Sequence, residues 1–110
     1  MPIDINAIAS TIKTGITGIA QSSLKDYLPQ AESDGQNIVN AIKANIQTWA
    51  AQLASGEISA DDLKFLILSN EEMLKVAALT QAGILQIELD KFKQQVSNLI
   101  VNTLLSVVKV

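Results

Sequence analysis

Residues 82–108, AGILQIELDKFKQQVSNLIVNTLLSVV, decide the fold class of this chain. Apolar residues recur along the stretch at alternating steps of three and four, the spacing of one helix face, until a threonine takes the last position: Ala82, Leu85, Leu89, Phe92, Val96, Leu99 and Thr103. Beyond residue 99, apolar residues occupy nearly every face. Because a helix that is apolar all round is usually covered on several sides, the stretch predicts a largely buried C-terminal helix.

The predicted last helix covers residues 70–109, with a possible break at Gly83. Unbroken, it would be roughly 60 Å long at about 1.5 Å per residue. A compact domain of this size has a radius of gyration of only about 13 Å. The helix must therefore protrude and pair with another chain, or break at Gly83. Strong helix formers on both sides of this glycine, over residues 77–89, favour the continuous helix.

The first predicted helix runs from Asp4 to Leu28. Isoleucines at three- and four-residue spacing form one apolar stripe along it: Ile5, Ile8, Ile12, Ile16 and Ile19. Asp4 is placed as an N-cap or first-turn acid, and Pro29 is expected to end the helix or turn it sharply. Two internal glycines, Gly15 and Gly18, indicate a hinge or the close approach of another helix, or they are simply tolerated in a well-packed helix.

The second predicted helix covers Gln30 to Ala54, with Pro29 able to occupy its first turn, and is followed by Gly56 as a stop signal. A later start near Asp34 is the alternative, because residues 33–35, Ser-Asp-Gly, are typical of a turn. The expected buried face holds Ile38, Ile42, Ile46, Trp49 and Leu53. The single tryptophan is most simply a core side chain, with an exposed anchor for a partner as the alternative.

A short helix is predicted from Ala60 to Leu68. Ser59 and Asp62 have capping-box spacing, and Ile58 and Leu63 form a hydrophobic staple around them. The same pattern recurs ten residues later, where Ser69 and Glu72 would begin the last helix. The chain is therefore expected to be a single all-α domain over residues 1–110, a small bundle of three longer helices and one short helix.

Composition excludes several classes of site. The chain has no cysteine, histidine or arginine and a net charge of −3. It therefore lacks thiolate and imidazole ligands, and a sequence-independent grip on nucleic acid is not expected. Ser-x-x-Lys pairs at residues 10–13 and 22–25 lack the further motifs of serine–lysine enzymes. Residues 56–62 match half of a calcium loop, but the capping box explains them. We predict no enzyme activity, cofactor or metal.

Membrane insertion is not expected from the sequence either. The N-terminal residues show no signal peptide, and the longest uncharged stretch, residues 94–108, is too short to span a bilayer. The expected location is therefore the cytoplasm.

Self-association is the function that the sequence favours. Apolar residues make up 48% of the chain and charged residues only 17%, a surplus that suggests surface buried against a partner. The candidate interface between copies lies on the last helix and comprises Leu85, Leu89, Phe92, Val96, Leu99, Ile100, Leu104 and Val108. Two alternatives stay open: binding to a membrane surface through amphipathic helices, and carriage of a small hydrophobic ligand between helices.

Overall fold

A computed structural model describes residues 4–70 and 73–108 of the chain. These residues form six α-helices, one 3-10 turn and no strand, which confirms the predicted all-α class. The elements are α1 (Ile5–Ser23), η1 (Lys25–Tyr27), α2 (Leu28–Lys43), α3 (Ile46–Ser55), α4 (Ala60–Ser69), α5 (Ala77–Gln81) and α6 (Gln86–Val108). The radius of gyration is 13.7 Å, and the longest dimension is 41 Å.

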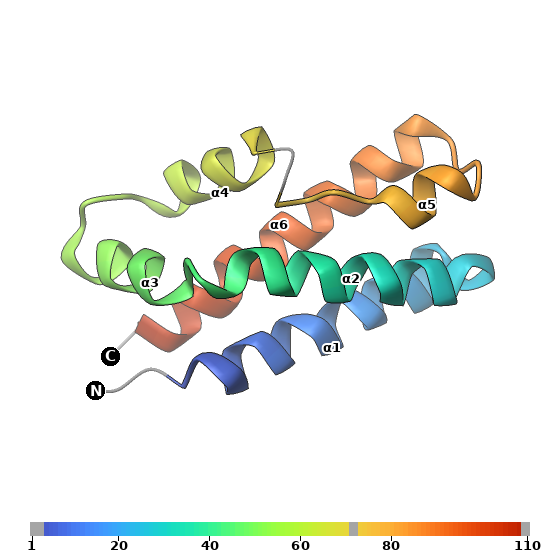
Figure 1. Cartoon of the computed structure of the whole chain (residues 1–110). Helices are drawn as coiled ribbons and strands as arrows, with labels where there is room; N and C mark the ends of the chain where they lie inside the picture. The colour runs from blue at the N-terminus through green and yellow to red at the C-terminus, as the bar shows by residue number, and fades with distance from the viewer. Residues whose placement is uncertain (1–3, 71–72, 109–110) are drawn as a thin grey trace.

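The helices are arranged around α6, the longest of them. Figure 1 shows α1 and α2 side by side, with α6 crossing behind them toward the end of the molecule where both chain termini lie. The main packing contacts join α6 to α1, α3 and α4, and they join α2 to α1 and α5. Because α6 contacts three other helices, it is covered on several sides, as its apolar sequence predicts.

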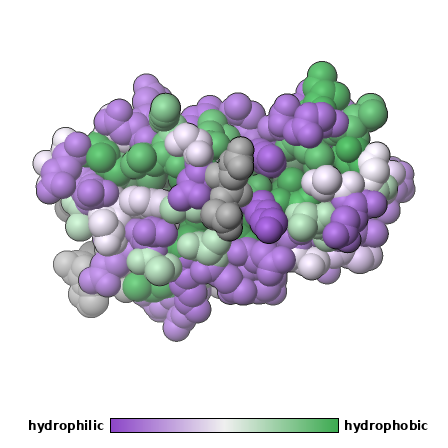
Figure 2. Space-filling view, turned by 45° about the horizontal axis from the view of Figure 1, so that its top comes forward, coloured by the Kyte–Doolittle hydropathy of each residue, from purple (hydrophilic) through white to green (hydrophobic). Residues whose placement is uncertain are grey.

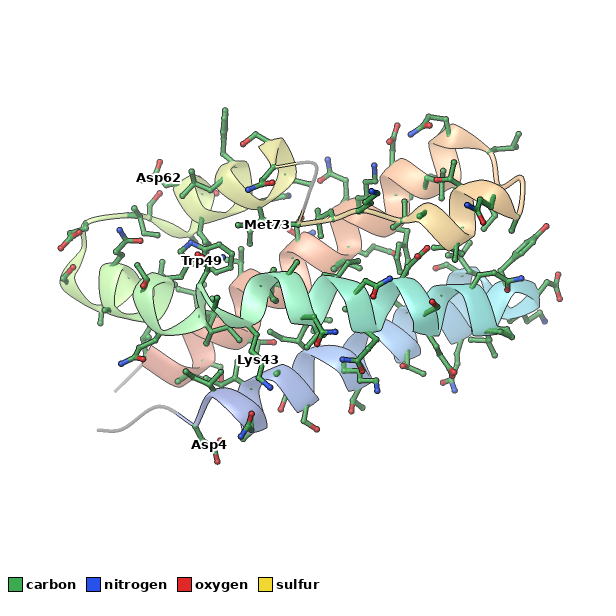
Figure 3. The ribbon with its side chains drawn as sticks, viewed as in Figure 1. Asp4, Lys43, Trp49, Asp62 and Met73 are labelled. Atoms are coloured by element: carbon green, nitrogen blue, oxygen red, sulfur yellow. The ribbon has the colours of Figure 1, made fainter. Side chains whose placement is uncertain are left out.

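One connected cluster of buried side chains forms the core. The isoleucine stripe of α1 supplies Ile8, Ile12 and Ile16, while α2 and α6 supply the facing residues. Trp49 of α3 is 94% covered and points into the bundle (Figure 3), so the interpretation of this tryptophan as a core residue is confirmed. The isoleucine stripe and Trp49 therefore both pack in the core of the chain itself.

The first helix ends earlier than predicted. α1 begins after Asp4, whose carboxylate accepts the Ala7 N–H at 3.0 Å, as expected for an N-cap. It stops at Ser23 rather than Leu28, since Leu24 leaves helical geometry and turns into the core. The η1 turn then reverses the chain. Pro29 lies in the first turn of α2 instead of ending α1, which its missing N–H permits.

The alternative start of the second helix near Asp34 is wrong, because Asp34 and Gly35 lie inside α2. The glycine is there for packing and not for a turn. A Cβ atom added to Gly35 would lie 2.9 Å from the Cγ2 atom of Ile16, closer than real Cβ contacts. The absent side chain thus lets α1 and α2 approach each other.

The predicted helix from Gln30 to Ala54 is two helices. α2 ends at Lys43 and α3 begins at Ile46, with the Asn45 N–H donating to the Ile42 carbonyl at 2.8 Å across the break. The break redirects the chain so that α3 packs against α6. Gly56 ends α3 in the left-handed conformation at φ 81°, as its role of stop signal predicts.

The capping box that begins α4 is confirmed. The Asp62 N–H donates to the Ser59 hydroxyl at 3.0 Å, and the Ser59 N–H donates to the Asp62 carboxylate at 2.9 Å. The second predicted box does not begin a helix: the Ser69 hydroxyl donates to the Phe65 carbonyl at 2.7 Å, inside the last turn of α4. Glu72, its expected partner, lies outside the described residues.

The continuous last helix from residue 70 is wrong. Five-residue α5 ends at Gln81, the chain reverses over residues 82–85, and α6 runs from Gln86 to Val108. Gly83 is the break, with φ 85°, a conformation that other residues adopt only at a cost. The reversal lets α5 bury Leu79 and α6 bury Leu89 in the same core. Lys109, the predicted end, lies outside the described residues.

Candidate functional site

The eight candidate interface residues are divided between the core and the surface. Five of them are buried within the chain's own fold: Leu89, Phe92, Val96, Ile100 and Leu104. Leu99 and Val108 are half-buried, and Leu85 is 70% exposed. In this conformation, therefore, the chain's own helices cover most of the predicted seam, and a second copy could reach it only at the edges.

Leu99 lies against a glycine of α1. A Cβ atom added to Gly15 would be 2.6 Å from the Cδ2 atom of Leu99, whereas one added to Gly18 would meet nothing within 4 Å. Among the predicted roles of these glycines, close approach of another helix thus applies at Gly15, and Gly18 is a glycine tolerated inside α1.

Two strongly exposed apolar side chains lie where α6 begins. Leu85 is 70% exposed and Ile87 is 61% exposed, and the half-buried Ile84 precedes them. Figure 2 shows hydrophobic surface at this end of the molecule, over the α5–α6 turn. We call Leu85 and Ile87 the α6-start patch. Ile87 was not predicted as a site residue, because it does not belong to the seam of three- and four-residue spacing. The sequence signal for it was Gly83, four residues earlier, since a break of the helix there would expose Ile87.

A second exposed apolar pair lies on α4. Phe65 is 62% exposed and Leu66 is 47% exposed. Phe65 also lines a shallow depression together with Lys64 and Leu68. The pair was not predicted as a site, because the short helix offered no apolar face longer than two turns.

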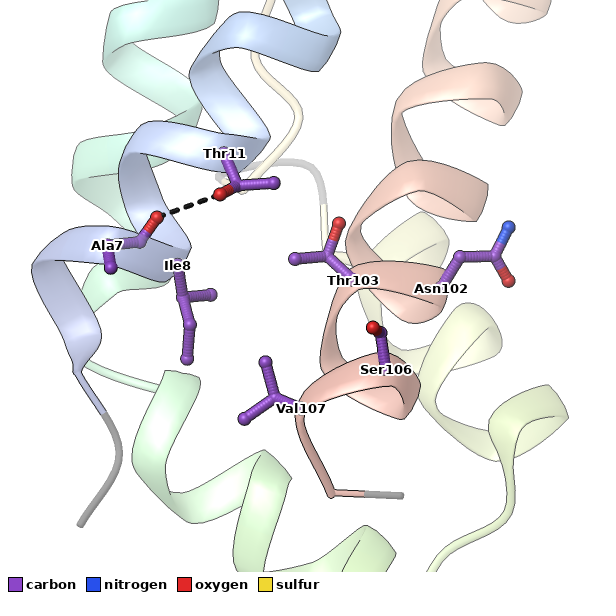
Figure 4. A pocket seen from close by; sticks show the side chains of 7 residues that line it. All are labelled: Ala7, Ile8, Thr11, Asn102, Thr103, Ser106 and Val107. Atoms are coloured by element: carbon purple, nitrogen blue, oxygen red, sulfur yellow. Dashed lines mark hydrogen bonds between the residues drawn. The ribbon is translucent and has the colours of Figure 1, made fainter. Parts of the chain in front are cut away.

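A groove runs between the first turns of α1 and the last turns of α6 (Figure 4). It measures about 430 Å³, is open to solvent, and is lined by Ala7, Ile8, Thr11, Asn102, Thr103, Ser106 and Val107. The Thr11 hydroxyl donates to the Ala7 carbonyl at 3.0 Å, and the Thr103 hydroxyl donates to the Leu99 carbonyl at 2.7 Å. Both threonines thus bond within their own helices, and the open shape is unlike the enclosed cavity of a ligand carrier.

One buried carboxylate connects distant parts of the chain. Asp34 of α2 is 1% exposed and accepts the Ala78 N–H at 3.0 Å and the Leu79 N–H at 2.8 Å. These groups lie at the start of α5, where helix N–H groups lack partners within the helix. Asp34 therefore caps a helix more than forty residues away in sequence. The cap was not predicted, because Asp34 and its partners lie 44 and 45 residues apart in the sequence.

Among the described residues, the Ser-x-x-Lys pairs and the acidic residues do not form a catalytic or metal site. Ser10, Lys13, Ser22 and Lys25 all have exposed side chains. Across residues 4–70 and 73–108, no three carboxylates come together to hold a metal ion. Among the same residues, none of the helices combines the length and apolarity needed to cross a bilayer. The isoleucine stripe of α1, the amphipathic feature behind the membrane-surface alternative, faces the core.

No protein-family model matches the chain, and neither the curated proteins nor the solved structures include a match.

Proposed function

We propose that this chain is a non-catalytic interaction protein whose copies associate through the beginning of the α6 helix. The observation that carries the proposal is the α6-start patch: Leu85 and Ile87, two large apolar side chains, are 70% and 61% exposed within three residues. Isolated exposed leucines are ordinary, but two strongly exposed apolar side chains within one helical turn favour a contact with another apolar surface, and this pair is more exposed than Phe65 and Leu66.

A second copy is the occupant that this patch fits best. A two-fold dimer brings the same patch of each copy together, so one apolar patch supplies both sides of the contact. The charged residues that line a pocket together with Leu85 are Lys25, Asp26 and Glu88, which leave no strong excess of either charge there. Two copies can therefore meet without a large repulsion between like charges.

The expected affinity is modest. Burying one leucine or isoleucine contributes roughly 1.5–3 kcal/mol. A two-fold contact buries Leu85 and Ile87 of both copies, so these four side chains contribute about 6–12 kcal/mol. Association itself costs an estimated 4–15 kcal/mol. Because these quantities nearly cancel, the patch alone predicts a dissociation constant nearer to about 1 mM than to 1 nM. Measurements must extend to high protein concentration.

Light scattering coupled to size exclusion tests the proposal. The wild-type mass should rise above the 11.8 kDa of one chain as concentration increases. Replacing both patch residues, Leu85→Gln with Ile87→Gln, should restore the single-chain mass. The matched control, Phe65→Gln with Leu66→Gln, removes a similar apolar pair from α4 and should leave association unchanged. A wild-type chain that keeps the single-chain mass throughout, or equal losses in both variants, would overturn the proposal.

A further inference from the structure

The α5–α6 turn works against the helical preference of the residues around it. Residues 77–89 include alanine, leucine, glutamine and glutamate, which favour helix on both sides of Gly83. The turn nevertheless reverses the chain over residues 82–85. Its reversal depends on Gly83 at φ 85°, with the glycine N–H donating to the Thr80 carbonyl at 3.1 Å. The conformation of four residues, 82–85, thus separates the folded turn from a straight helix, and Gly83 is the one among them with positive φ.

The helices on the two sides of this turn make their main contacts with different partners. α5 is held by α2, through buried Leu79 and the hydrogen bonds from Asp34. α6 packs instead against α1, α3 and α4. If the turn straightened, α5 could keep its place on α2, and α6 could find the same surfaces on a second copy of the chain. Every major helix pair would be preserved, with the α6 pairs now formed between chains.

We propose that two copies associate by exchanging α6, with residues 82–85 as the hinge. In the exchanged form, residues 77–108 become one helix of roughly 48 Å at about 1.5 Å per residue. That length exceeds the 41 Å longest dimension of the described chain, so the helix reaches into the partner. The buried seam from Leu89 to Leu104 then lies between chains. This inference rests on the proposed self-association and specifies its mechanism.

The α6-start patch has a place in the exchanged dimer. The two hinges run past each other between the two folded bodies, so residues of one hinge lie near those of the other. Leu85 belongs to the hinge, and Ile87 follows it by two residues. Side chains that are exposed in the single chain would thus be covered in the dimer, which adds apolar burial that the single chain lacks.

Two substitutions at the hinge should shift the equilibrium between the single chain and the exchanged dimer in opposite directions. Gly83→Ala strains the turn, because alanine disfavours positive φ, and it favours a helix. It should lower the dimer dissociation constant at least tenfold. Gln86→Pro is tolerated at the first position of α6 but breaks a continuous helix, and it should raise the constant at least tenfold. Gly56→Ala is the control: Gly56 also has positive φ, 81°, but lies outside the hinge.

Cross-linking then distinguishes exchange from surface association. The chain has no cysteine, so Thr11→Cys with Thr103→Cys introduces a single pair facing each other across the α1–α6 groove (Figure 4). A short bismaleimide should join these positions within one chain in the monomer fraction. In the dimer fraction the exchange requires it to join two chains, giving double mass on a denaturing gel.

Each result has a definite meaning. Double-mass products from the dimer fraction, enhanced by Gly83→Ala and suppressed by Gln86→Pro, support the exchange. Dimers whose cross-links stay within single chains overturn the exchange and leave the surface association intact, as does a Gly83→Ala dissociation constant equal to that of Gly56→Ala. If neither the wild type nor Gly83→Ala forms dimers, both proposals fall.

Discussion

Replacing Asp34 by alanine removes both of the acceptors that α2 offers to the start of α5. The carboxylate is 1% exposed, and its bonds to the Ala78 and Leu79 N–H groups measure 3.0 and 2.8 Å. A hydrogen bond to a charged group contributes roughly 1.5–3 kcal/mol to stability. Two such bonds give about 3–6 kcal/mol, a large part of the roughly 5–15 kcal/mol that holds a typical domain folded.

Detachment of α5 sets an upper limit on this loss. α5 has five residues, and its single fully buried side chain is Leu79. If α5 leaves α2, its N–H groups bond to water, and the chain loses burial worth roughly 1.5–3 kcal/mol for one leucine along with the cap. Detachment would thus cost about 4.5–9 kcal/mol in all, more than the two hydrogen bonds alone. The expected decrease in the free energy of unfolding for Asp34→Ala is therefore about 3–6 kcal/mol, concentrated at α5.

Urea unfolding and native-state amide exchange together measure the effect. Asp34→Ala should lower the urea midpoint and should speed exchange most at the amides of Ala78 and Leu79. Asp34→Asn keeps one acceptor oxygen and is expected to fall between the wild type and Asp34→Ala. Asp4→Ala is the matched control, because Asp4 caps α1 from an exposed position with one 3.0 Å bond. That loss should cost only about 0.5–2 kcal/mol.

Two results would contradict the role of Asp34 as the cap that holds α5. If Asp34→Ala lowers the free energy of unfolding no more than Asp4→Ala, the buried cap stabilises the fold no more than an exposed one. If the amides of Ala78 and Leu79 also remain as protected as in the wild type, then Asp34 does not hold α5 in place.

Two further predictions concern packing and charge. Gly18→Ala should raise the free energy of unfolding by about 1 kcal/mol, because alanine has the higher helix propensity. Gly15→Ala should be about 1–3 kcal/mol less stable than Gly18→Ala in urea unfolding, because the new Cβ atom displaces Leu99. Equal effects of the two substitutions would contradict the close contact between Gly15 and Leu99. The Ser59 N–H, and secondarily the Ser59 hydroxyl, holds the pKa of Asp62 below its ordinary value of 3.8. Because the lowered pKa belongs to the folded state, the stabilisation is present above pH 3.8 and lost as the pH falls through the folded value. The stability advantage of the wild type over Asp62→Asn should therefore shrink below that pH, and an advantage that stays constant down to pH 2 would contradict it.

Local sequence signals predicted the parts of the fold that local interactions determine. The capping box of Ser59 and Asp62 begins α4 as expected, because both hydrogen bonds join residues three apart. The isoleucine stripe of α1 is buried where the helical period places it. The capping box needs only residues of the same helix end, and the stripe needs only the helical period to show which face of α1 is apolar.

Features that depend on distant residues could not be predicted in this way. The break between α2 and α3 has no glycine or proline, and the fully buried Ile42 and Ile46 on its two sides continue the helical spacing. What favours the break is the packing of α3 on α6, which only the assembled bundle supplies. The cap from Asp34 to Leu79 likewise joins residues 45 apart, so nothing near either residue announces it.

The seam of α6 shows why an apolar pattern predicts burial but not the chain that provides the cover. Leu89, Phe92 and Val96 are buried, as their spacing requires, yet the helices that cover them belong to the same chain. An interface between copies built from these residues differs from the observed core only in the conformation of residues 82–85. The energetic balance between the two states therefore depends on the cost of the turn at Gly83, on the exposed Leu85 and on protein concentration, and not on the seam, whose contacts are the same in both.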